Sequence, residues 1–241
     1  MHAHIIPKSL ESLIENNTIK GITIETNSDT KLKSIVFNDK SRHPYSEIFY
    51  SIHKRLKIMK SQNILKQVIS IIPRLFLYDF IDEEAILIHK TFNNDISDVV
   101  KEYTGNFIGM GSVPLQNVKA SIEELGRLKH ELKFKSVQIG TFINGRNLSD
   151  EEFVPFFKKA EELGMFVFLH PLIVNDNELT RNYHLSNLVG NPVQTTIAIT
   201  NLMFSGIFDL APNLKIGLAH GGGFLPYQLG RMQHGYQVRN D

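Results

Sequence analysis

LKIGLAHGGGFLPYQLGR, at residues 214–231, is the stretch of sequence that decides the fold. It opens with an apolar run that ends in His220, passes through three consecutive glycines and leads into an amphipathic segment at 224–236. A short continuous apolar run predicts a strand that is covered on both faces, and the segment after it predicts a helix. The stretch therefore predicts one strand–helix unit of a parallel sheet, with a histidine at the end of the strand.

The same unit recurs along the chain, because short apolar runs alternate with amphipathic segments throughout. This alternation is typical of α/β proteins with parallel strands. The expected strands are 2–6, 67–72, 107–113, 136–140, 165–170 and 214–220. The expected helices are 47–62, 82–103, 118–132, 150–163, 193–208 and 224–236.

We expect a single domain over residues 1–241, because no linker, repeat or low-complexity tract interrupts the pattern. About six strand–helix units are present, whereas a (β/α)8 barrel has eight. Either the sheet is open or the sequence is a fragment that is incomplete at its C-terminal side. Segment 21–37 breaks the rhythm with a polar NSDT turn between apolar positions, and it predicts an inserted β-hairpin.

The sequence predicts where helix 150–163 begins and ends. Ser149 or Asp150 is the expected N-cap, and Gly164 is expected to end the helix.

Composition favours small-molecule chemistry. The 26 basic and 25 acidic residues give a net charge of +1 without blocks of like charge, which argues against a nucleic-acid binder. The most apolar stretch, 165–174, is much shorter than the roughly 20 residues of a membrane span. With no cysteine, any metal site must use histidine and carboxylate, and we expect a cytoplasmic protein.

Four histidines fall on strands or at their ends. His2 and His4 project to the same face of the first strand, and His170 and His220 end two later strands. Each one alone is more often a core or rim histidine bound to backbone, but four together at strand ends indicate a metal site. Neutral imidazoles suit Zn²⁺, and three protein ligands with an open position are usual in catalytic sites. His220 is then either a further ligand or the base for bound water.

The glycines after His220 have two interpretations of about equal weight. They allow backbone N–H groups to approach an anion or a substrate oxygen closely, or they serve a tight turn that needs positive φ. Elsewhere, the carboxylates show no paired spacing of the glycosidase kind. Of the remaining histidines, which read as surface or packing residues, His184 and His234 are the strongest candidates for another role.

Four segments, distributed over nearly the whole chain, resemble a known protein family. They are HAHIIP (2–7), VQIGTFINGRNLSDEEFVPFF (137–157), LGMFVFLHP (163–171) and NLVGNPVQTTIAITNLMFSGIFDLAPNLKIGLAHGGGFLPYQLGR (187–231). Together they resemble the amidohydrolase-related family of 2-amino-3-carboxymuconate 6-semialdehyde decarboxylase, with the γ-resorcylate and 5-carboxyvanillate decarboxylases as cousins. The resemblance implies a distorted TIM-like (β/α)8 barrel of the metal-dependent hydrolase type, with a small β insertion near its N-terminus.

The resemblance also implies roles for individual residues. His2, His4 and His170 correspond to metal ligands, and His220 to the histidine that activates metal-bound water or transfers protons. Arg231 matches an arginine that reaches a neighbouring subunit's site to hold a substrate carboxylate, which implies a homodimer. Arg42 lies near the family's other carboxylate-binding arginine; for both arginines the plain alternative is an exposed, solvated side chain.

Two family residues have no counterpart here: the aspartate just before His-x-His and the metal-binding aspartate after the eighth strand. The favoured function is a metal-dependent, non-oxidative decarboxylase of an unsaturated or aromatic carboxylic acid. It would use one divalent metal, Zn²⁺ first and Mn²⁺ second, with no organic cofactor and a small-molecule carboxylate as substrate. The alternatives are a hydrolase or hydratase on the same scaffold, or an inactive fragment lacking the C-terminal metal-binding aspartate.

Overall fold

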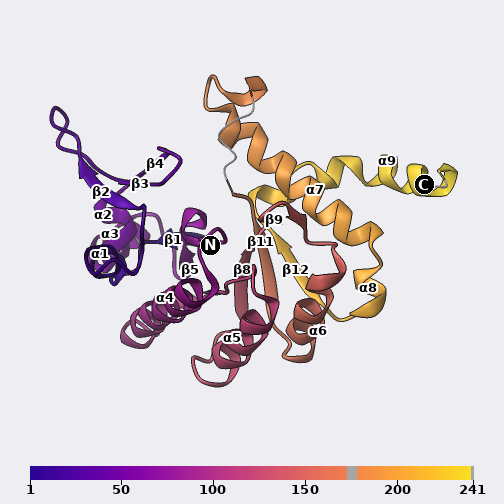
Figure 1. Ribbon diagram of the computed structural model, residues 1–241, viewed down its shortest axis with the longest axis horizontal. Helices are drawn as coiled ribbons and strands as arrows, with labels where there is room; N and C mark the ends of the chain where they lie inside the picture. Colours follow the sequence, from indigo (N-terminus) through magenta and orange to yellow (C-terminus); the bar gives the residue numbers. More distant parts are fainter. Residues whose placement is uncertain (173–177, 240–241) are drawn as a thin grey trace. The chain divides into compact units, whose positions relative to one another are not determined.

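The computed structural model describes residues 1–172 and 178–239. It contains two compact units, Met1–Gln138 and Ile139–Asp241, and each is described by itself (Figure 1). Residues 173–174 of the apolar stretch at 165–174 lie outside the described residues. Within the described part of the chain, no helix combines the length and apolar character that crossing a membrane requires.

Parallel strands form the centre of the first unit. They are β1 (His2–Ile5), β5 (Gln67–Ile71), β6 (Phe107–Gly109), β7 (Gly111–Ser112) and the part of β8 (Ser136–Gly140) up to Gln138. The first three pair in the order β1-β5-β6, and β7 pairs with β8. In this register His4 lies beside Ser70, and Ser112 lies beside Gln138. The parallel pairing confirms the predicted α/β class.

Helices and a 3-10 turn cover these strands. They are α1 (Leu10–Glu15), α2 (Glu47–Tyr50), α3 (Ile52–Ser61), the turn Pro73–Leu75, α4 (Asp82–Glu102) and α5 (Val118–His130). The long α4 buries one apolar face that includes Ile88 and Phe92, and acidic residues fill its first turn, where they complement the helix dipole. The side chain of Asn117 caps α5 by accepting from the Ala120 N–H at 2.9 Å.

The insertion in the first unit is a three-stranded antiparallel sheet. Strands β2 (Thr23–Thr26) and β3 (Lys33–Val36) pair as the predicted hairpin, and β4 (Arg42–Pro44) adds a third strand. The turn between β2 and β3 is held by the side chain of Asn27, whose Oδ1 accepts from the backbone N–H groups of Asp29 and Thr30.

The second unit contains a parallel strand pair and a short hairpin. Strand β11 (Phe166–His170) pairs with β12 (Lys215–Leu218), and β9 (Phe142–Ile143) pairs antiparallel with β10 (Arg146–Asn147). The helices are α6 (Val154–Glu162), α7 (Asn191–Phe204), α8 (Ile207–Leu210) and α9 (Leu225–Val238). Short 3-10 or π turns occur at Glu151–Phe153, Glu178–Thr180, Ser186–Gly190 and His220–Gly222.

Both predicted ends of the segment 150–163 are visible. Asp150 precedes the 3-10 turn that leads into α6, although its side chain makes no capping hydrogen bond. Gly164 follows α6 with φ of 62°, the left-handed conformation that commonly ends a helix.

Candidate metal centre

His2 and His4 lie on the same face of β1, as their spacing predicts. Their ring centroids are 4.6 Å apart and the ring planes are nearly perpendicular, at 88°. The Nδ1 atom of His4 lies 3.0 Å from the carbonyl oxygen of Ile71 at the end of β5. Because a carbonyl can only accept, His4 carries its proton on Nδ1, which leaves the lone pair on Nε2.

His170 and His220 lie together in the second unit. Their ring centroids are 5.0 Å apart, with 72° between the ring planes. His170 ends β11 and is buried, and its Nδ1 donates to the carbonyl oxygen of Pro171 at 2.9 Å. It therefore has the same proton position as His4, with its lone pair on Nε2.

His220 occupies an unusual backbone position for a non-glycine residue. It follows β12 with φ of 53°, in the left-handed region, where histidine is tolerated better than most residues. Partial burial lowers the pKa of its imidazole from the ordinary value, so the ring is neutral near pH 7. Strained backbone of this kind clusters at functional sites.

These histidines suit a borderline divalent ion. Imidazoles that ligate metals usually donate their second ring nitrogen to a carbonyl or carboxylate, which fixes the tautomer and orients the ring. His4 and His170 each show this arrangement. Within either unit, the described residues hold no group of three or more His, Asp or Glu side chains that could by itself bind a metal ion. His2 and His4 belong to the first unit, and His170 and His220 to the second.

The glycine run after His220 is required by the backbone. Gly221, Gly222 and Gly223 have φ of 65°, 87° and 63°. A Cβ atom on Gly223 would lie 2.3 Å from the carbonyl oxygen of Pro192 on α7. The turn also binds α7 through the Phe224 N–H, which donates to Thr196 Oγ1 at 2.8 Å. The tight-turn interpretation is thus confirmed for this segment.

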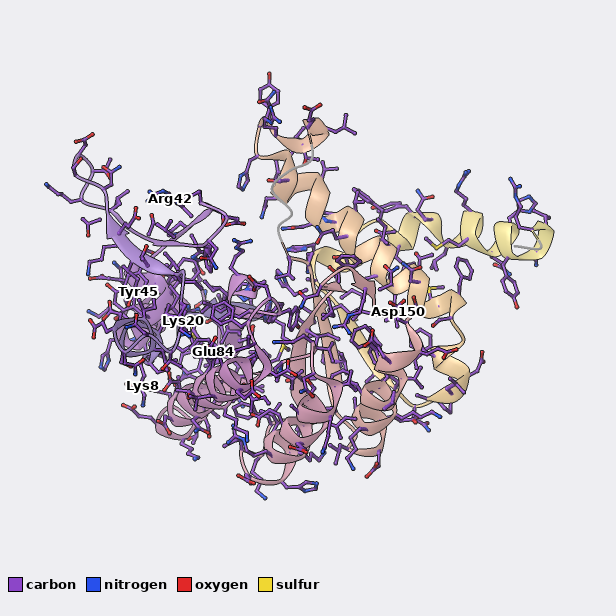
Figure 2. All side chains as sticks on the ribbon, viewed as in Figure 1. Lys8, Lys20, Arg42, Tyr45, Glu84 and Asp150 are labelled. Atoms are coloured by element: carbon purple, nitrogen blue, oxygen red, sulfur yellow. The ribbon has the colours of Figure 1, made fainter. Side chains whose placement is uncertain are left out.

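The two candidate arginines lie on the surface. Arg42 is on β4 (Figure 2). Its guanidinium pairs with the Glu25 carboxylate at 2.7 Å, and both side chains are about half exposed. Arg231 is exposed on α9. Arg42 therefore already pairs with a carboxylate of its own chain, through a single contact between Nη2 and Oε2.

Sequence reasoning missed three polar residues of the first unit. Arg74, just after β5, binds both carboxylate oxygens of Asp39 at 2.8 Å and stacks over the Phe37 ring. Ser70 on β5 and Gln138 on β8 are fully buried and connect to His2 and His4. The available signal was a polar residue inside an apolar run, as in QVISII and SVQIG, because a buried polar group needs a partner.

Comparison with known proteins gives curated relatives that are decarboxylases. The 2-amino-3-carboxymuconate-6-semialdehyde decarboxylase of Dictyostelium discoideum is 35% identical over 242 residues, covering 100% of this chain and 67% of its own length. The γ-resorcylate decarboxylase of Rhizobium sp. (strain MTP-10005) is 26% identical over 200 residues, covering 75% of this chain and 58% of its own length.

Solved structures of the same kind share the fold. IDCase of Metarhizium anisopliae superimposes with a TM-score of 0.87 at 21% identity, covering 99% of this chain and 69% of its own. The 5-carboxyvanillate decarboxylase of Novosphingobium aromaticivorans DSM 12444, complexed with manganese, gives 0.79 at 24% identity, covering 99% and 71%. These likenesses confirm the TIM-like α/β fold.

The amidohydrolase family model matches residues 1–240, which include His2, His4, His170 and His220. This match spans both units of the chain. The chain therefore belongs to the amidohydrolase family, and the two curated relatives described above are decarboxylases.

Proposed function

We propose that this protein is a metal-dependent, non-oxidative decarboxylase of an unsaturated or aromatic carboxylic acid. The observation that carries the proposal is the shared arrangement of His4 and His170, whose Nδ1 atoms both donate to backbone carbonyls. Histidines that ligate metals typically donate their second ring nitrogen in this way. The decarboxylase relatives supply the reaction class.

In this proposal His2, His4 and His170 hold one divalent ion. Imidazole ligands suit Zn²⁺, which is our first choice, and Mn²⁺ is the second because a related decarboxylase structure contains it. The bound ion would supply Lewis-acid polarisation of a substrate oxygen. No organic cofactor is needed, because the conjugated substrate itself receives the electrons.

His220 is the proposed proton carrier. Decarboxylation breaks the bond between the carboxylate carbon and the substrate carbon, and the electron pair stays with the substrate. The conjugated system delocalises that pair until His220 transfers to the substrate carbon a proton that it has first taken up from solvent, which forms the new C–H bond. Because burial lowers the pKa of His220, its imidazolium form is a stronger acid than an exposed one and gives up the proton readily.

Arg42 and Arg231 are the proposed carboxylate-binding residues. Arg42 would exchange its Glu25 partner for a substrate carboxylate, because a guanidinium can bind a carboxylate bidentately. Arg231 on the exposed face of α9 would serve the site of a second copy, so the proposal includes a homodimer. The absence of cysteine fits a cytoplasmic protein.

The release of CO₂ separates this function from hydrolysis or hydration on the same scaffold. Purified protein loaded with Zn²⁺ or Mn²⁺ is incubated with a panel of aromatic and unsaturated carboxylates, and headspace CO₂ is measured. We expect CO₂ from at least one substrate, and a fall of about 10²-fold or more in the His220→Ala variant. The exposed His130, at the end of α5, gives the control variant His130→Ala, which should retain full activity. Consumption of substrate without CO₂ would contradict the proposal and favour the hydratase or hydrolase.

A further inference from the structure

Ser70 and Gln138 form a buried polar pair beside the histidines of β1. Both side chains are fully buried, and each interrupts an otherwise apolar strand, Ser70 on β5 and Gln138 on β8. Buried polar groups are retained only where their hydrogen bonds are satisfied. The hydrogen-bond partners of Ser70 and Gln138 therefore indicate the role of the two side chains.

The direction of each hydrogen bond in the pair follows from the Gln138 amide. Gln138 Nε2 lies 3.4 Å from the carbonyl oxygen of Ile71, which can only accept, so the NH₂ group must face that carbonyl. Gln138 Oε1 then faces the hydroxyl of Ser70, with which it is in hydrogen-bond contact. Ser70 consequently donates its single hydrogen to Gln138.

Ser70 Oγ can therefore only accept from the histidines. It lies 2.8 Å from Nε2 of His2 and 3.4 Å from Nδ1 of His4. His2 must carry its proton on Nε2 to make the first bond. His4 carries its proton on Nδ1, shared between Ser70 and the nearer Ile71 carbonyl.

We propose that Gln138 and Ser70 are positioning residues of the candidate metal centre, and that they fix opposite tautomers on His2 and His4. The proposal rests on the function proposed above for its metal role, but the tautomers belong to the metal-free protein. Gln138 fixes the direction in which the Ser70 hydroxyl donates, and this leaves Ser70 Oγ to accept from both rings. The Ile71 carbonyl accepts from the Gln138 amide and from the His4 ring. Outer partners of this kind typically change metal affinity by about 10–100-fold when removed.

The direct test is the tautomer of each ring in the metal-free protein, read from long-range ¹H–¹⁵N NMR correlations, with His2→Asn and His4→Asn variants to assign the signals. We expect the Nε2–H form for His2 and the Nδ1–H form for His4. In Gln138→Leu the hydroxyl of Ser70 is released to donate to His2, so the His2 population should shift toward Nδ1–H while His4 is unchanged. The proposal would be overturned if His2 and His4 had the same tautomer in the wild type, or if the His2 tautomer did not shift in Gln138→Leu.

Matched controls separate positioning from ordinary burial. Gln67 is a buried glutamine of β5 that accepts from Arg55 at 3.1 Å, and Ser112 is a buried serine of β7 that contacts His89 at 2.8 Å. Gln67→Leu and Ser112→Ala should lower stability but leave both tautomers as in the wild type. If these controls shift the tautomers as much as Gln138→Leu does, the effect is general loosening and the proposal fails.

Metal affinity provides the second readout, measured by competition with a chromophoric chelator for Zn²⁺ and Mn²⁺. Ser70→Ala and Gln138→Leu should weaken binding about tenfold or more, and Ser70→Thr should restore it because it keeps the hydroxyl. Unchanged affinity in both variants would overturn the positioning role. A wild type that binds neither ion would contradict the proposed function and remove the metal role, while the NMR result would still decide the hydrogen-bond assignment.

Discussion

His89 is a fully buried histidine whose two ring nitrogens both have hydrogen-bond partners. Its Nε2–H donates to the Phe76 carbonyl at 2.9 Å, so its Nδ1 accepts from the Ser112 hydroxyl at 2.8 Å. Burial lowers the pKa of the imidazole to about 4, against an ordinary 6.5. The ring is neutral in the folded protein. Protonation would remove the hydrogen bond that Nδ1 accepts from Ser112 and would place a charge in a buried site.

This burial predicts a loss of stability in mild acid. Between about pH 6.5 and pH 4 the unfolded chain binds a proton on residue 89 that the folded chain does not, so the free energy of unfolding falls as pH falls. The contribution is fully present above the unfolded pKa, and its loss over the window amounts to about 3 kcal/mol. Urea denaturation across the window measures it. In His89→Gln the free energy of unfolding should depend less steeply on pH, because unfolding of this variant takes up about one proton fewer. Equal slopes in the two proteins would contradict the prediction.

The backbone of His220 supports a second prediction at this scale. A non-glycine residue with φ of 53° is strained by its Cβ, typically by about 1–2 kcal/mol. Glycine at this position removes the strain, whereas alanine keeps it. His220→Gly should therefore be more stable toward urea than His220→Ala by about 1 kcal/mol. Equal stability of the two variants would mean that the turn is not strained at this residue.

At the scale of elements, the turn after β12 is joined closely to α7. A Cβ on Gly223 would meet the Pro192 carbonyl at 2.3 Å and Thr196 Oγ1 at 2.7 Å, whereas one on Gly221 would meet nothing within 4 Å. Both glycines have positive φ. Gly221 has ψ of 18°, in the left-handed helical region, whereas Gly223 has ψ of −127°, a conformation that non-glycine residues adopt at higher cost. An alanine at Gly223 therefore meets both a costlier conformation and a clash.

Gly223→Ala should destabilise the protein more than Gly221→Ala does. Gly221→Ala pays the cost of positive φ alone, about 1–2 kcal/mol. Gly223→Ala adds a clash with a backbone atom, and we expect a further loss on the order of 1–3 kcal/mol. Thermal unfolding of the two variants measures the difference. If Gly221→Ala is equally or more destabilising, α7 does not constrain this turn.

Strands and long helices were predictable from the sequence because each carries an unbroken pattern. All six predicted strand segments contain strands, and α4 and α5 lie within the expected ranges. The helix expected over 47–62 is wrong in one respect, because Ser51 is extended and starts α3 as its N-cap. Helix α1 and strand β4 were missed, because six and three residues are too few to show a period.

The candidate site was predictable to the same degree. The His-x-His spacing placed His2 and His4 on one face of a strand, and strand ends placed His170 beside His220. The contacts of Ser70 and Gln138 were beyond reach, because they depend on the register of strands far apart in the sequence. Arg42 was predicted only by resemblance, and its pairing with Glu25 depends on the inserted sheet.

For the molecule as a whole, each unit supplies two of the four candidate histidines. The family match runs through both units, and the Dictyostelium relative aligns over the whole chain while the chain spans 67% of that relative's length. The proposed ligands His2, His4 and His170 would bind the ion in the folded chain and not in the unfolded chain. Metal binding should therefore also stabilise the protein by mass action.

The most direct measurement is the metal content of the purified protein by inductively coupled plasma mass spectrometry, beside the His170→Ala, His220→Ala and His130→Ala variants. We predict about one Zn²⁺ or Mn²⁺ per chain in the wild type, in His220→Ala and in His130→Ala, and a large loss in His170→Ala. Wild-type protein that remains free of divalent metal after reconstitution, or His170→Ala protein that keeps its full content, would contradict the assignment of these histidines as the metal centre.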